Sequence, residues 1–142
     1  MIGALLRMPV DAVTARILDD LHAAGFTDLV PAHFGVMRWP GPQNRRPSDL
    51  AREAGMTKQA MNYLLRQLEE LGYLTRDDDA EDKRSKRVQL TDRGYAVAKT
   101  IRKTVRQIER EWERELGPDQ FDRLRRLLAE LNGTRMVREH LG

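Results

Sequence analysis

The feature that most constrains the fold is a pair of short helical segments separated by a glycine turn within residues 48–71. Ala51 and Gly55 lie four positions apart, so a small residue stands where two helices would cross closely. The glycine permits the backbone that a tight turn needs. Thr57 is suited to cap the second helix, whose apolar residues share one face as far as Leu71. This spacing predicts a helix-turn-helix.

The polar face of the second helix carries cations, amides and hydroxyls, and no acid interrupts it before Glu69. The alternative is an ordinary solvated helix face, but such faces usually mix acidic with basic residues. Side chains of these types donate to phosphates or read base edges in a major groove. We predict that the face contacts nucleic acid through Thr57, Lys58, Gln59, Asn62, Tyr63 and Arg66.

Residues 73–76 and 86–90 are typical of two short strands, and the polar run between them predicts a hairpin. A hairpin after a helix-turn-helix is the arrangement called a winged helix. The candidate wing residues that would follow phosphates or enter the minor groove are Lys83, Arg84, Lys86 and Arg87. A turn that neutralises itself is the alternative, because the hairpin also holds Asp77, Asp78, Asp79, Glu81 and Asp82.

The flanking segments are predicted to be helical, with apolar residues recurring at helical spacing. Helices are expected over residues 9–24, 28–37, 48–54, 57–71, 91–116 and 118–131, with Ser48 and Thr91 as further caps. The expected organisation is N-terminal dimerisation helices at 1–37, a winged-helix core at 38–90 and C-terminal dimerisation helices at 91–142. A proline-rich loop, 38–47, leads into the core.

The helix expected over residues 91–116 has about 25 residues and is therefore roughly 37 Å long, which exceeds what a small winged helix can cover. A partner helix is the better way to bury its apolar row, so the sequence predicts a homodimer. The residues expected in the interface are Val13, Ile17, Leu21, Ile101, Val105, Ile108, Trp112, Phe121, Leu124 and Leu128.

Composition excludes several classes of protein. The chain has no cysteine, which removes disulfides, thiol catalysis and cysteine-based zinc sites. It has no glycine-rich phosphate loop and no nucleophile elbow, so it is not expected to be an enzyme. No apolar run is long enough to span a membrane and no leader is recognisable, which predicts a cytoplasmic protein. No cofactor and no metal are expected.

Residues 48–94 resemble the DNA-binding core of the MarR family of bacterial transcriptional regulators. The motifs are MTKQAMNYLLRQLEELGYLTR, then Asp82-Lys83-Arg84, then RVQLTDRG. The resemblance implies a mostly α fold with a small β-hairpin wing, and an obligate homodimer that binds a pseudo-palindrome in double-stranded DNA, most often as a repressor. It also implies that Asp82 orients Arg84 and that Arg84 reaches into the minor groove.

The resemblance further implies a small aromatic or apolar effector that releases the DNA. Candidate lining residues are Phe26, Phe34, Met37, Trp39 and Trp112, with Arg16 or Arg38 for a carboxylate. Ordinary core packing is the alternative for these side chains. Two other functions stay open: a winged helix that binds a protein, which the acidic wing favours, and non-specific binding to double-stranded RNA or to the chromosome.

Overall fold

A computed structural model describes residues 1–38, 40–78, 81 and 86–141. The elements are α1 (Ile2–Ala23), the 3₁₀ turn η1 (Pro31–His33), α2 (Phe34–Met37), α3 (Pro47–Glu53), α4 (Lys58–Glu70), β1 (Leu74–Asp78), β2 (Lys86–Leu90), α5 (Asp92–Leu116), α6 (Pro118–Asn132) and α7 (Arg135–Leu141). They form two compact units, Met1–Thr104 and Val105–Gly142. The predicted class, mostly α with a small hairpin, is confirmed.

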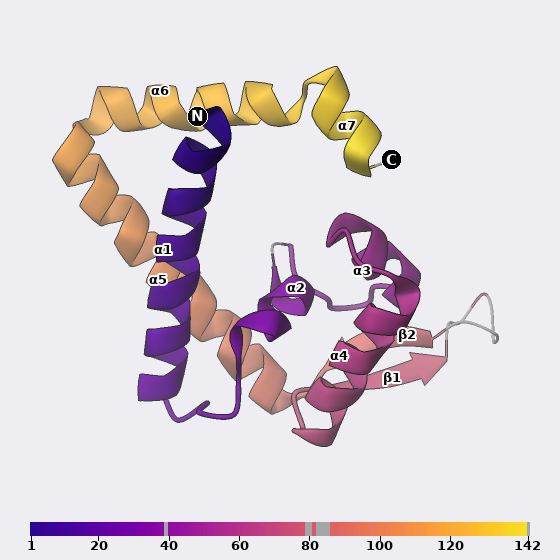
Figure 1. Cartoon of the computed structure of the whole chain (residues 1–142). Coiled ribbons are helices and arrows are strands. Elements are labelled where there is room, and N and C mark those ends of the chain that lie inside the picture. Colours follow the sequence, from indigo (N-terminus) through magenta and orange to yellow (C-terminus); the bar gives the residue numbers. More distant parts are fainter. Residues whose placement is uncertain (39, 79–80, 82–85, 142) are drawn as a thin grey trace. The chain divides into compact units, whose positions relative to one another are not determined.

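The helix-turn-helix is present as predicted. Helix α4 begins after Thr57, whose hydroxyl accepts a hydrogen bond of 3.1 Å from the amide of Ala60. The turn before it contains Gly55 with a φ of +65°, a conformation that favours glycine. Figure 1 shows α3 and α4 as a pair with the hairpin alongside α4. The side chains of α4 that are buried beneath the pair are Met61, Leu64, Leu65 and Leu68.

The hairpin is antiparallel, with Leu74 opposite Leu90 and Asp78 opposite Lys86. The proline-rich loop also bonds to the hairpin. The amide of Asn44 donates to the carbonyl oxygen of Val88 at 2.7 Å, and the amide of Val88 donates to the carbonyl oxygen of Arg45 at 2.9 Å. The loop therefore runs along the outer edge of β2 and fixes the base of the wing.

Several predicted boundaries were wrong. Helix α1 begins at Ile2 rather than at residue 9 and keeps Pro9 inside, where the missing amide removes one backbone bond without ending the helix. The segment 28–37 forms only η1 and the single turn α2, and Pro31 opens η1. Ser48 does not cap α3, which starts one residue earlier at Pro47.

The strand β1 was predicted one to two residues too early, and α7 was not predicted. The other caps and breaks agree with the sequence. Thr91 accepts from the amide of Gly94 at 3.2 Å and donates to the carbonyl oxygen of Gly72 at 2.6 Å, so it ends the hairpin and starts α5 together. Within the described residues, no helix is long and apolar enough to cross a membrane.

A polar clamp ties the start of α5 to the segment before η1. The hydroxyl of Tyr73 donates to Asp28, and Arg93 Nη2 donates to the second Asp28 oxygen at 3.1 Å. The guanidinium of Arg93 lies 4.2 Å from the centre of the Tyr73 ring. Burial alone would raise the pKa of Asp28, but the bonds from Tyr73 and Arg93 outweigh it and hold that pKa below the ordinary value of an aspartate. Burial and the carboxylate raise the pKa of Tyr73.

Tyr73→Phe tests this clamp. The variant removes the hydroxyl and leaves the Asp28 carboxylate with one partner fewer, so the free energy of unfolding at about pH 7 should fall by roughly 1–3 kcal/mol. Because the pKa of Asp28 is lowered by folding, its carboxylate stabilises the fold at pH values above the ordinary aspartate pKa. This contribution is lost as the pH falls through the pKa of the folded state. Urea unfolding at about pH 7 and about pH 3 should therefore show less acid sensitivity in the variant than in the wild type.

The matched control for that measurement is Tyr95→Phe, which removes the same atom from an exposed ring on α5. Its free energy of unfolding should stay within about 0.5 kcal/mol of the wild type. Equal effects of the two substitutions would show that the clamp does not stabilise the fold.

Candidate nucleic-acid interface

The structure places the predicted side chains of α4 on one face of the first unit. Lys58, Gln59, Tyr63 and Arg66 are exposed, and Asn62 is half-buried. Thr57 holds the helix start through its capping bond. The face is aligned by the buried row on the opposite side of α4, which fixes the rotation of the helix.

A groove of about 370 Å³ adjoins this face. It is lined by Arg46, Pro47, Ser48, Lys58, Asn62, Arg76 and Lys86, which come from α3 and the residue before it, α4, β1 and β2. Four of these seven residues are cations and none is acidic. A concave surface of this charge attracts a polyanion and focuses its field. Sequence reasoning missed Arg46 and Arg76, because only the strand register and the path of the loop bring them to α4.

Arg76 connects the hairpin to the face of α4. Its Nη1 donates to the amide oxygen of Asn62 at 3.3 Å, and its Nη2 donates to Glu69 Oε1 at 3.3 Å. Arg76 stands opposite the buried Val88 in the hairpin register. The guanidinium is therefore held between one acid and one amide of the same helix.

Among the cations predicted in the wing, two are described and both have protein partners. Lys86 pairs with Asp78 at 2.7 Å, and Arg87 Nη1 donates to the carbonyl oxygen of Asn44 at 2.7 Å. The first pair agrees with partial self-neutralisation of the hairpin. The remaining predicted residues of this region, Asp82, Lys83 and Arg84, lie outside the described residues, as does Trp39.

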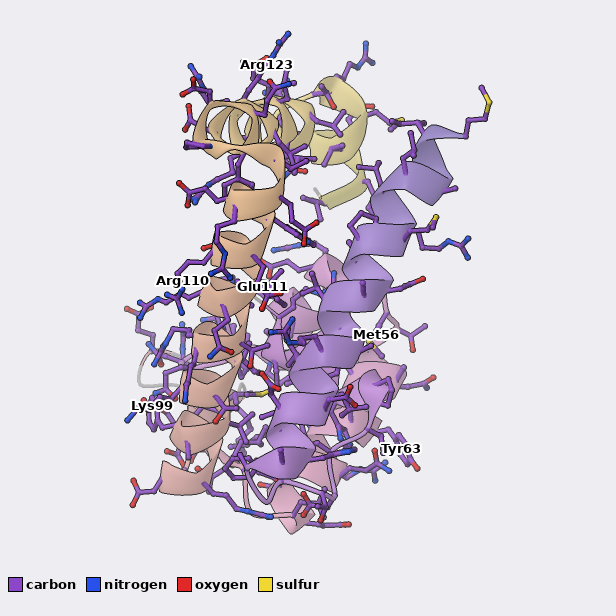
Figure 2. The ribbon with its side chains drawn as sticks, turned by 90° about the vertical axis from the view of Figure 1, so that its left-hand side faces the viewer. Met56, Tyr63, Lys99, Arg110, Glu111 and Arg123 are labelled. Carbon is purple, nitrogen blue, oxygen red and sulfur yellow. The ribbon has the colours of Figure 1, made fainter. Side chains whose placement is uncertain are left out.

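Tyr63 is oriented by a row of hydrogen bonds that starts at η1. The amide of Val30 donates to Nδ1 of the buried His33 at 3.1 Å, so the ring proton is on Nε2, which lies 3.3 Å from Gln67 Oε1. Gln67 in turn donates to the Tyr63 hydroxyl oxygen at 3.1 Å. Tyr63 lies on the side that Figure 2 shows opposite Lys99, with its hydroxyl oxygen held by Gln67.

The residues predicted for a dimer interface differ in exposure. Leu21 is fully buried and Ile17 is nearly so, whereas Val13 and Ile101 are half-buried. In the second unit, Ile108 and Phe121 are buried, Val105 and Trp112 are half-buried, and Leu124 and Leu128 are exposed. Among the predicted effector residues, Phe26 packs edge-on against Tyr73 with ring centres 6.1 Å apart, and Met37 is buried.

These elements define a winged helix-turn-helix protein with a cationic groove along its second helix. Comparison with known families matches residues 27–85 to the MarR family. The HTH-type transcriptional repressor Rv2887 of Mycobacterium tuberculosis is 37% identical over 130 residues, which are 92% of this chain and 87% of the relative. The chain therefore belongs to the MarR family of transcriptional regulators, which are not enzymes.

Solved structures agree in fold over nearly the whole chain. The M. tuberculosis MarR family protein Rv2887 in complex with salicylic acid has a TM-score of 0.65 at 30% identity, covering 92% of this chain and 96% of that one. The transcriptional repressor CouR bound to a 23-mer DNA duplex has a TM-score of 0.70 at 27% identity, covering 92% of both chains.

Proposed function

We propose that the chain is a homodimeric repressor that binds a pseudo-palindromic operator in double-stranded DNA. The observation that carries this proposal is the face of α4 that bears no acid between Thr57 and Glu69, together with the groove beside it. Lys58, Gln59 and Arg66 would enter the major groove, and the cations of the groove would contact flanking phosphates. The similarity to a repressor solved on a DNA duplex supports the same function.

The wing adds a second contact in this proposal. Arg84, oriented by Asp82, would reach into the minor groove beside the major groove that α4 occupies, with Lys83 near the phosphates. Lys86 and Arg87 would exchange a protein partner for a phosphate or support the base of the wing. Two such units would read half-sites whose centres lie about 34–36 Å apart.

The dimer in this proposal is built by the segments 1–37 and 91–142 around the core at 38–90. Helix α6 exposes a row of leucines, each at least 37% exposed: Leu124, Leu127, Leu128 and Leu131. Helix α1 likewise exposes Ile2, Leu5 and Met8. Apolar rows of this length on both segments are unfavourable in water, and a second copy would bury them.

Leu128→Glu should split the dimer without unfolding the single chain, because Leu128 is exposed in the monomer whereas Ile108 is not. A charge buried without a partner opposes association strongly. Light scattering should give twice the chain mass of 16.4 kDa for the wild type and about that chain mass for the variant. Ala129→Glu, an exposed change of equal charge on the other side of α6, should stay dimeric. A wild type that is monomeric would contradict the proposed dimer.

We also propose that a small aromatic carboxylate weakens DNA binding. The relative solved with salicylic acid supports this class of ligand. In the first unit the candidate contacts are Phe26, Phe34 and Met37, with Arg16 or Arg38 for the carboxylate. Salicylate should lower DNA affinity in proportion to its occupancy, and Phe34→Ala should reduce that response. Benzyl alcohol, which lacks the carboxylate, is the matched negative ligand.

The direct test of the proposed function is footprinting on the DNA upstream of the chain's own gene. A dimer should protect two half-sites related by a two-fold axis and separated by about one helical turn. Protection that follows no symmetric sequence, or that persists equally on scrambled DNA, would contradict a sequence-specific repressor. The Leu128→Glu variant should lose the protection at the same protein concentration.

A further inference from the structure

The hydrogen bonds around Asn62 restrict what this residue can read on DNA. A guanidinium carries only donors, so the end of the Asn62 amide that faces Arg76 must be its oxygen. Glu69, seven residues further along the same face of α4, holds the other end of the guanidinium. One of the two lone pairs of the amide oxygen is therefore occupied within the protein, and the amide nitrogen is the end that turns away from Arg76. Asn62 also lines the cationic groove.

We propose that Arg76 is a specificity-determining positioning residue that makes Asn62 select guanine instead of adenine. This inference rests on the proposed function, because it concerns the base that the α4 face reads. It assigns Arg76 no base contact of its own. Its role is to fix the direction of the Asn62 amide through the 3.3 Å bond, and Glu69 keeps Arg76 in place.

The chemistry of the base edges gives the preference. An asparagine reads adenine with two bonds, accepting from the N6 amino group and donating to N7. With one lone pair of its oxygen held by a cation, Asn62 is a poorer acceptor for the N6 group, and the guanidinium charge repels a second donor. Guanine presents N7 and O6 side by side, and both accept from the amide nitrogen. Cytosine presents an amino donor, and thymine offers one acceptor beside a methyl group.

The surroundings of Asn62 act in the same direction. Arg46, Lys58 and Lys86 also line the groove, and each carries donors only. The Tyr63 hydroxyl oxygen accepts from Gln67, which leaves its proton as a donor for a ligand. A lining with four cations and no acid favours the base edge with the most negative electrostatic potential in the major groove, which is that of guanine.

The test is selection of bound duplexes from a randomised pool by the full-length protein and three variants. Asn62→Ala removes the amide group that would contact the base. Arg76→Met frees the amide oxygen of Asn62 and keeps an unbranched side chain, whereas Arg76→Lys keeps a cationic donor at that position. The wild type should select guanine at one base pair of each half-site, and Asn62→Ala should leave that position unselective. Arg76→Met should shift the same position toward adenine by roughly ten-fold or more, and Arg76→Lys should keep guanine.

The comparison of the wild type with Asn62→Ala needs no Arg76 variant, so its result can be used even if Arg76→Met unfolds. Adenine at the position that depends on Asn62 in the wild type would overturn the inference while leaving the repressor proposal intact. Asn62→Ala weakening every sequence equally would also overturn it, because Asn62 would then contact a phosphate. If the wild type selects no common sequence, the proposed function fails and the inference fails with it. Loss of affinity in Arg76→Met with guanine retained would show a merely structural role for Arg76.

Discussion

Lys58→Glu is expected to reduce the affinity for DNA by about 100-fold at moderate salt. Lys58 stands in the first turn of α4, is exposed and lines the cationic groove. In the proposed complex the substitution would remove a phosphate contact from each subunit and place a carboxylate near the phosphates, where a Debye length of about 8 Å would screen it little. Fluorescence anisotropy of a labelled operator duplex measures the change directly.

Lys99→Glu is the matched control for this prediction. It changes the net charge equally on an exposed position of α5, and Figure 2 shows Lys99 on the side opposite Tyr63. Its affinity should stay within about three-fold of the wild type, because only the long-range field changes. Equal losses in both variants would mean that net charge alone governs binding, and the groove would then have no special role.

Gly94→Ala should cause the largest loss of stability, about 3 kcal/mol in the free energy of unfolding. Gly94 lies in the first turn of α5, against the turn that joins α4 to β1. An added Cβ would overlap the carbonyl oxygen of Tyr73 and come within 3.0 Å of Leu90 Cδ2. A backbone oxygen cannot swing aside, so α5 would have to move. Movement would stretch the bond of 3.1 Å from the Thr91 amide to that same oxygen.

The control is Gly3→Ala in α1, where nothing lies within 4 Å of the added Cβ. Alanine is favourable in a helix, so this variant should change the free energy of unfolding by less than about 1 kcal/mol. Urea unfolding of the three proteins tests the prediction. A Gly94→Ala variant as stable as the wild type would show that the start of α5 is not held against Tyr73.

Local signals in the sequence were sufficient for the central part of the fold. Thr57 and Thr91 each begin a helix by capping it, and both caps are present. Pro9 misled the prediction of α1, because a proline near a helix start resembles a first-turn residue although the helix continues upstream. The role of loop 38–47 was also hidden, since its bonds to Val88 join residues more than forty positions apart.

The candidate interface was predictable only in part, for a related reason. The side chains of α4 share a face by helical periodicity, which the sequence displays. Arg46 and Arg76 reach that face through the loop path and the hairpin register, neither of which a periodic pattern reports. The bond from Arg76 to Asn62 depends on both, so the direction of the Asn62 amide has no signature in the sequence.

The central claim, sequence-specific DNA binding by the α4 face and its groove, is tested most directly by anisotropy at several salt concentrations. The operator duplex is compared with a scrambled duplex of the same composition. The predicted result is tighter binding to the operator by at least about 1,000-fold, and an affinity that falls steeply as salt rises because several phosphates are contacted. Equal affinity for both duplexes, or binding that salt does not weaken, would contradict the claim and favour a winged helix that recognises a protein.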